Sequence, residues 1–93
     1  HRYFGNSKPD IDDWQYLNGD QLTEDIHRVK TILDDIYTGK WINTGISKGG
    51  QTTIFYRYFY PEDVDVSVPY VAPLNLAYED TRIYSWLQRK KIL

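Results

Sequence analysis

The sequence predicts an α/β protein in which strands and helices alternate along the chain and neighbouring strands run parallel. Three observations predict this class: an amphipathic helical pattern from Asp20, an apolar run that ends in Gly-Ile-Ser-Lys-Gly, and alternating valines after Pro61. The two central helices are long enough to connect parallel strands, and such connections are almost always right-handed. With 93 residues, the chain forms at most one small domain.

The N-terminal half is predicted to contain the end of a strand, a loop and a long helix. Residues 1–4 are apolar enough to end a strand, residues 5–13 form a polar loop, and residues 14–17 are a short buried or extended piece. Asn18 or Asp20 is suited to cap the following helix, and Gly39 suits the left-handed position beyond its end. Apolar side chains that recur at steps of three and four share one face of this helix, namely Leu22, Ile26, Val29, Ile32, Leu33, Ile36 and Tyr37.

The C-terminal half is predicted to complete the order strand, helix, strand, helix, strand. Residues 41–46 form a short strand, and a helix from residue 49 or 50 to residue 60 is stopped by Pro61. Aromatic side chains surround this helix, so it should be buried on most sides. The β-rich residues 64–71 include Pro69, which implies a strand end, a bulge or an edge. A further helix is expected within residues 75–93.

The motif Gly45-Ile46-Ser47-Lys48-Gly49 is typical of a nucleophile elbow, where a strand ends, a serine occupies a strained turn and a helix begins at once. Glycine is expected two residues before and after the serine because a Cβ there would collide across the turn. Gly50 would be a second small residue where the helix crosses the strand. The backbone N–H of Lys48 would form half of an oxyanion hole. The alternative is a glycine-rich turn that binds phosphate, although the P-loop spacing is not met.

Composition excludes several other classes of function. The net charge of −2 does not resemble the basic footprint of a nucleic-acid-binding protein, and no apolar run approaches the roughly 20 residues of a membrane span. No cofactor and no metal site are predicted. The absence of cysteine removes cysteine-ligated metals, and the acidic residues Asp10, Asp12 and Asp13 lack the glycine and terminal glutamate of a calcium-binding loop. This acidic segment is predicted to be a solvated loop.

Four stretches of the chain together resemble a family of serine peptidases. HRYFGNSKP, DWQYLNGDQLTEDIHRVK, KWINTGISKGG and FYPEDVDVSVPYVAPLN are similar to one continuous block of the secreted prolyl tri/tetrapeptidyl aminopeptidases. These are α/β-hydrolases related to Pro-X carboxypeptidase and dipeptidyl peptidase II. The Pro-X carboxypeptidase branch has Ser-Tyr-Gly-Gly where this chain has Ser-Lys-Gly-Gly, so Lys48 favours the aminopeptidase branch.

The resemblance implies a site, a fold and a location. Ser47 would be the acylated nucleophile and the Lys48 N–H an oxyanion donor. Residues 1–74 would be the nucleophile-bearing part of an α/β-hydrolase domain, and residues 75–93 a trailing helix or the start of a helical cap. Family substrates are the N-termini of peptides, often with proline near the cleaved bond. The protein would be secreted or lie in the periplasm or cell envelope, and this chain would be an internal fragment whose partner is the remainder of the same polypeptide.

The other members of a catalytic triad are not expected in this chain. In α/β-hydrolases the acid and then the histidine follow the serine, but His1 and His27 both precede Ser47. We expect His1 to mark a strand, His27 to be a solvated helix residue, Asp63 to lie in a turn or cap, and Asp80 to cap the last helix. Asp65 also comes too early for the triad. Alone, the chain is therefore expected to be inactive, and an esterase-like hydrolase or a non-catalytic α/β binding module stays open.

Overall fold

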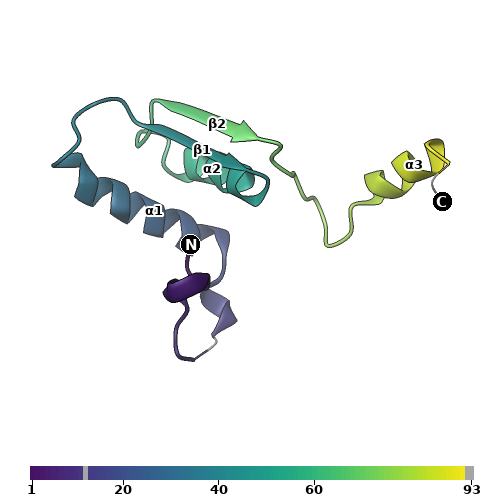
Figure 1. Ribbon diagram of the computed structural model, residues 1–93, viewed down its shortest axis with the longest axis horizontal. Helices are drawn as coiled ribbons and strands as arrows, with labels where there is room; N and C mark the ends of the chain where they lie inside the picture. Colours follow the sequence, from purple (N-terminus) through teal and green to yellow (C-terminus); the bar gives the residue numbers. More distant parts are fainter. Residues whose placement is uncertain (12, 92–93) are drawn as a thin grey trace.

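The computed structural model describes residues 1–11 and 13–91. Its elements, in chain order, are two 3-10 turns (Gly5–Ser7 and Trp14–Tyr16), helix α1 (Gly19–Asp34), strand β1 (Ile42–Ile46), helix α2 (Lys48–Phe59), strand β2 (Val66–Tyr70) and helix α3 (Thr81–Arg89). In Figure 1, α1, β1, α2 and β2 lie together, whereas α3 stands apart at the end of an extended segment. The predicted α/β class and the alternation of helix and strand from α1 to β2 are confirmed.

The strand predicted at residues 1–4 is wrong. This segment forms a turn in which the Phe4 N–H donates to the His1 carbonyl at 3.3 Å and the Tyr3 N–H donates to the Ser7 carbonyl at 3.0 Å. Tyr3 has a φ of 66°, which no extended strand accommodates. The piece at residues 14–17 is an exposed 3-10 turn and is neither buried nor extended. Asp13 caps that turn, Asp10 is exposed, and Asp12 lies outside the described residues.

Helix α1 begins as predicted and ends earlier than its apolar pattern. The Asn18 side chain accepts a hydrogen bond from the Gln21 N–H at 2.9 Å, which satisfies one of the amides at the start of the helix. The helix closes with the Tyr37 N–H donating to the Leu33 carbonyl at 2.8 Å. Gly39 does not take the predicted left-handed conformation, because the positive-φ glycine of the described residues is Gly5. The chain therefore leaves α1 through residues 35–37, before the glycine.

Strands β1 and β2 form the sheet of the described residues and run parallel, with Ile42 opposite Val66 and Ile46 opposite Tyr70. The parallel arrangement confirms the prediction and follows from the crossover through α2. Pro69 lies inside β2, opposite Gly45, and it is tolerated because β2 is an edge of this sheet. Figure 1 shows α2 packed beneath both strands and α1 beneath α2, so the body has a sheet layer followed by helices.

Only a small set of side chains is buried in this body. The buried apolar residues are Leu22, Tyr56 and Val64, and they are joined by Thr23, Thr52 and Thr53, whose hydroxyls bond to carbonyls within their own helices. The prediction that α2 is buried on most sides is wrong: Tyr56 is 2% exposed, but Tyr58 is 78% exposed. The predicted apolar face of α1 is also largely open to solvent, at Val29, Ile32 and Ile36.

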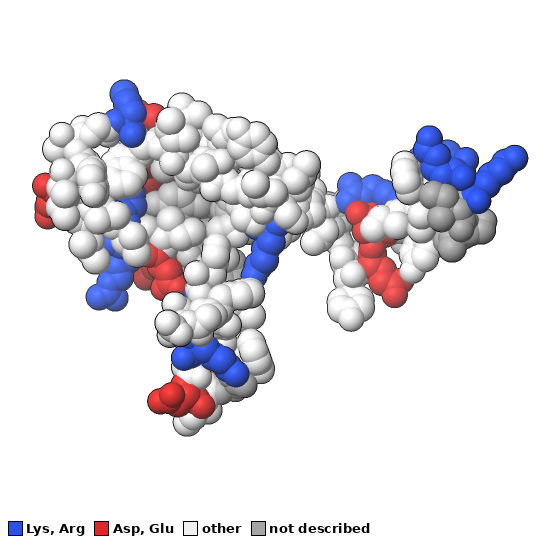
Figure 2. All heavy atoms as spheres, viewed as in Figure 1, with Lys and Arg blue, Asp and Glu red and all other residues white. Residues whose placement is uncertain are grey.

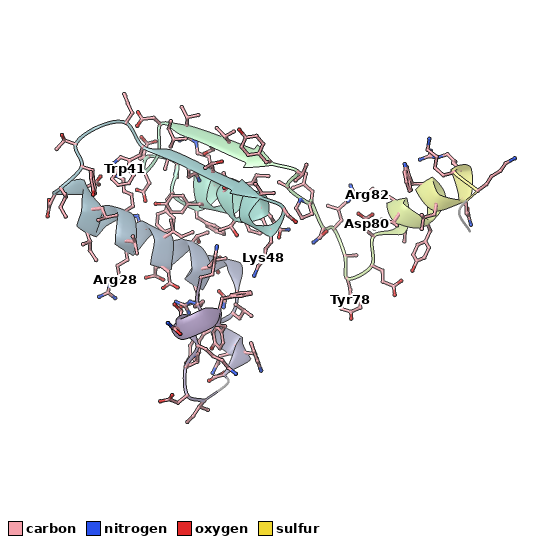
Figure 3. The ribbon with its side chains drawn as sticks, viewed as in Figure 1. Arg28, Trp41, Lys48, Tyr78, Asp80 and Arg82 are labelled. Atoms are coloured by element: carbon pink, nitrogen blue, oxygen red, sulfur yellow. The ribbon has the colours of Figure 1, made fainter. Side chains whose placement is uncertain are left out.

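Helix α3 is capped as expected and linked to the sheet by residues 71–80. The Asp80 side chain accepts a hydrogen bond from the Arg82 N–H at 3.1 Å, and the Arg82 guanidinium donates to the Leu74 carbonyl at 2.7 Å. Figure 3 shows Asp80 and Arg82 side by side at the start of α3. The predicted last helix thus exists over Thr81–Arg89, while residues 92–93 lie outside the described part. Among the helices described, none is long and apolar enough to cross a membrane.

Candidate active site

Ser47 lies at the junction between β1 and α2 in a strained backbone conformation. Its φ is 56° and its ψ is −118°, and the residue is exposed. A non-glycine residue in such a sparsely populated region costs on the order of 1–3 kcal/mol. The strand before it and the helix after it hold the residue there, since Ile46 ends β1 and Lys48 begins α2. The predicted sequence of strand, strained serine and helix is therefore present at this position.

The glycines around Ser47 differ in the space that surrounds them. A Cβ on Gly45 would lie 2.3 Å from the carbonyl carbon and oxygen of Gly49, which leaves no room for any side chain. A Cβ on Gly50 would lie 2.7 Å from the Tyr70 carbonyl oxygen, where α2 crosses β2. A Cβ on Gly49 would meet nothing within 4 Å, so the prediction that a side chain at this position would collide across the turn is wrong. Gly45 is thus the position at which the turn depends on glycine.

The paired N–H of Ser47 and the first amides of α2 lie at this turn. The Ser47 N–H donates to the Tyr70 carbonyl at 3.0 Å, which ties the turn to the carboxyl end of β2. Lys48 begins α2, and the first four amides of an α-helix have no carbonyl partner within the helix. The positive end of the helix dipole adds to their attraction for negative charge. The turn can therefore present N–H groups to an oxyanion beside an exposed hydroxyl.

The Lys48 side chain is held by the N-terminal segment. Its ammonium lies 4.3 Å from the centroid of the Phe4 ring, and Figure 3 shows it extending from the start of α2 toward that segment. The segment is in turn fixed to α1, because the Arg2 guanidinium donates twice to the Asp25 carboxylate, at 2.7 Å each. These hydrogen bonds hold the pKa of Asp25 below its usual value. The sequence contains no local signal for the contact between Phe4 and Lys48.

The histidines and carboxylates of the described residues do not form a triad with Ser47. His27 lies on α1 with its side chain 40% exposed, but it is more than the solvated residue that was predicted. Its Nδ1 lies 2.6 Å from Asp63 Oδ2, and its ring stacks on Tyr60 with centroids 4.2 Å apart. The Tyr56 hydroxyl donates to the same carboxylate oxygen. Asp63 follows α2 and precedes β2, so this cluster lies at the amino end of the sheet, opposite Ser47.

The remaining candidate acids are engaged in other contacts. Asp65 accepts from the Trp41 N–H at 2.9 Å and from the Lys40 ammonium at 2.7 Å, and Asp80 caps α3. His1 is an exposed residue of the N-terminal turn and its ring meets the Phe4 ring edge-on. Residues 1–11 and 13–91 contain no group of three or more histidine, cysteine, aspartate or glutamate side chains able to hold a metal ion. In Figure 2, acidic and basic side chains are scattered over the visible face, with basic ones gathered around the far end of α3.

Comparison with known proteins places this chain among peptidases. The PS-10 peptidase S37 family matches residues 1–90. A curated relative, the prolyl tri/tetrapeptidyl aminopeptidase of Streptomyces mobaraensis, is 38% identical over 84 residues, which is 90% of this chain and 18% of the relative. The chain thus spans less than one fifth of the length of that relative. No solved structure matches the chain significantly. With nearly its whole length matched, the chain belongs to the PS-10 peptidase S37 family.

Proposed function

We propose that residues 45–50 form the nucleophile elbow of a serine aminopeptidase and that Ser47 is the nucleophile. The observation that carries the proposal is the φ of 56° at an exposed Ser47, between a strand and a helix, with no room for a side chain at Gly45. Strained backbone of this kind clusters at functional sites. The peptidase family of the chain supplies the reaction class.

In the proposed reaction, Ser47 Oγ attacks the carbonyl carbon of a peptide bond. The new C–O bond forms as the hydroxyl proton passes to a histidine, and negative charge develops on the carbonyl oxygen, where the Lys48 N–H donates to it. Cleavage of the C–N bond releases the amine with that proton and leaves an acyl-serine. Water then attacks the acyl carbon and gives a proton to the histidine; the ester C–O bond breaks, the acyl peptide leaves as a carboxylic acid, and the histidine returns the proton to Ser47 Oγ. The histidine and its acidic partner belong to the remainder of the polypeptide, because His27 and Asp63 lie at the opposite end of the sheet.

The whole protein is proposed to complete an α/β-hydrolase fold around this turn. The relative named above releases tri- and tetrapeptides, as its name states, and we assign the same substrate class here: peptides whose free N-termini are removed in short pieces, with proline near the cleaved bond. Helix α3 would begin the helical cap over the site. Secretion or retention in the cell envelope follows from the family resemblance alone.

The test uses the full-length polypeptide and a fluorophosphonate, which phosphonylates activated serines with loss of fluoride. Labelling is expected in the wild-type protein and absent in Ser47→Ala, while Ser85→Ala, at an exposed serine of α3, retains it. Equal labelling of wild type and Ser47→Ala would remove Ser47 as the nucleophile. Release of tripeptides from a proline-containing peptide, compared with hydrolysis of a simple ester, then separates the aminopeptidase from an esterase.

A further inference from the structure

Two non-glycine residues with positive φ lie at matching positions of the sheet. Ser47, with φ 56°, directly follows β1, and Val71, with φ 43°, directly follows β2. The last residues of the two strands, Ile46 and Tyr70, face each other in the parallel register. Because neighbouring strands lie about 4.8 Å apart, the backbone at Val71 begins within roughly one strand spacing of Ser47.

The backbone around Val71 is coupled to the serine turn. The carbonyl of Tyr70 accepts the Ser47 N–H at 3.0 Å, and the same oxygen would lie 2.7 Å from a Cβ on Gly50. Ala72, on the other side of Val71, would approach that Cβ to 3.0 Å. The residues on both sides of Val71 therefore pack against the Ser47 turn and the first turn of α2.

Burial among the described residues does not account for valine at this position. A positive φ is rare for a β-branched residue, and glycine or asparagine accommodates it more easily. Val71 is 80% exposed, so its side chain contributes almost no buried apolar area in return for the unfavourable backbone. The described residues therefore leave an apolar side chain uncovered at the edge where parallel α/β sheets bind their ligands.

We propose that Val71 is a specificity-determining residue of the peptidase site, an inference that rests on the proposed function of Ser47. Its side chain contacts an apolar side chain of the peptide substrate next to the scissile bond. The strained backbone turns this valine out of the sheet at the level of the serine. Substrate binding then buries apolar surface of Val71 that the described residues leave exposed.

The experiment measures kcat/KM of the full-length protein on two peptide series, one varied on the acyl side and one on the leaving-group side of the scissile bond. Val71→Thr keeps the shape and branching of valine but replaces a methyl group with a hydroxyl. For peptides with a large apolar side chain at the contacted position, it is expected to lower kcat/KM about tenfold, which is the usual effect of a small change in an apolar pocket. For peptides with alanine at that position, kcat/KM should fall less than about twofold. Val71→Gly should lower kcat/KM at least as much without lowering the melting temperature, because it relieves the backbone.

Three results would overturn the proposal: a uniform loss across both series, no change in either series, or activity that falls only in step with the melting temperature. A small fluorophosphonate without a side chain should label both Val71 variants at the wild-type rate. Slower labelling would mean that Val71 acts on the serine turn and does not contact substrate. Failure of Ser47→Ala to abolish labelling would instead refute the proposed function, so the two failures are distinguishable.

Discussion

The two ends of the β1–β2 sheet differ in the interactions that stabilise them. Ser47 lies at the carboxyl end, whereas His27, Tyr56 and Asp63 meet at the amino end. At the carboxyl end the chain takes two positive-φ conformations, small residues allow close backbone approach, and the side chains of Ser47 and Val71 are exposed. At the amino end two side chains, His27 from α1 and Tyr56 from α2, converge on the Asp63 carboxylate of the following turn. The ends lie about 18 Å apart along α2, which has 12 residues.

The difference between the two ends distinguishes a candidate functional site from a cluster that stabilises the fold. Hydrogen-bonded side chains at the amino end satisfy one another, so that cluster stabilises the placement of α1 on α2. At the carboxyl end the strained backbone exposes the Ser47 hydroxyl near the first amides of α2, and these groups do not stabilise the packing of the elements. Strain of this kind is typical of a functional site. A histidine beside an aspartate is therefore not sufficient evidence for a triad, because its position relative to the serine decides its role.

The largest expected effect tests the backbone of the carboxyl end. Gly45→Ala should destabilise the full-length protein by about 3 kcal/mol, because its Cβ would lie 2.3 Å from the Gly49 backbone and something must shift. The matched control is Gly49→Ala, whose Cβ meets nothing within 4 Å; it should be neutral or stabilise α2 by up to about 1 kcal/mol. Urea denaturation of both variants measures the difference. Equal losses would show that the turn does not distinguish the two glycines.

The second prediction concerns the pH dependence of the amino end. Burial acts to raise the pKa of Asp63, but hydrogen bonds from His27 and Tyr56 outweigh it, and the pKa lies below its ordinary value. A carboxyl whose pKa is lowered in the folded state stabilises the protein above its unfolded pKa of about 3.9, and this contribution is lost as pH falls through the folded pKa. Stability should therefore decrease in acid below about pH 4. Asp63→Asn should remove that part of the decrease and cost about 2 kcal/mol at neutral pH.

The control for this prediction is Glu62→Gln, the exposed neighbour of Asp63. Its free energy of unfolding should stay within about 0.5 kcal/mol of wild type. Thermal melts of the three proteins from pH 3 to pH 7 provide the measurement. If Asp63→Asn retained the full acid dependence, the cluster would not be the titrating element. Loss of peptidase activity with unchanged stability would contradict the structural role given to the amino end.

The smallest expected effect tests the link between the N-terminal segment and the carboxyl end. Phe4→Leu removes the ring that faces the Lys48 ammonium, and Lys48→Met removes the charge. An exposed cation–π contact contributes about 0.5 kcal/mol, so a double-mutant cycle should give a coupling energy of that size. Raised salt should not abolish it as fully as it would an exposed ion pair. A coupling indistinguishable from zero would mean that the two side chains meet without stabilising each other.

Much of the central fold could be predicted because its signals are local. The Asn18 cap, the stop before Pro61, the Asp80 cap and the parallel pairing of the strands follow from nearby residues or from the length of a crossover. The strained serine was also predictable, since the five residues from Gly45 to Gly49 specify the turn themselves. The strand expected at residues 1–4 failed because strand formation needs a hydrogen-bonding neighbour, and a four-residue apolar pattern does not show whether one is present.

By itself, the sequence determined the class of the fold, the peptidase family and the position of the serine turn, because each depends on short motifs and on conformations of single residues. Only the tertiary structure decided that His27 belongs to Asp63, 36 positions along the chain, that Phe4 meets Lys48, and that Val71 stands beside Ser47. Contacts of this kind join residues far apart in the chain. Their formation depends on how the elements pack, and residue spacing along the chain does not encode it.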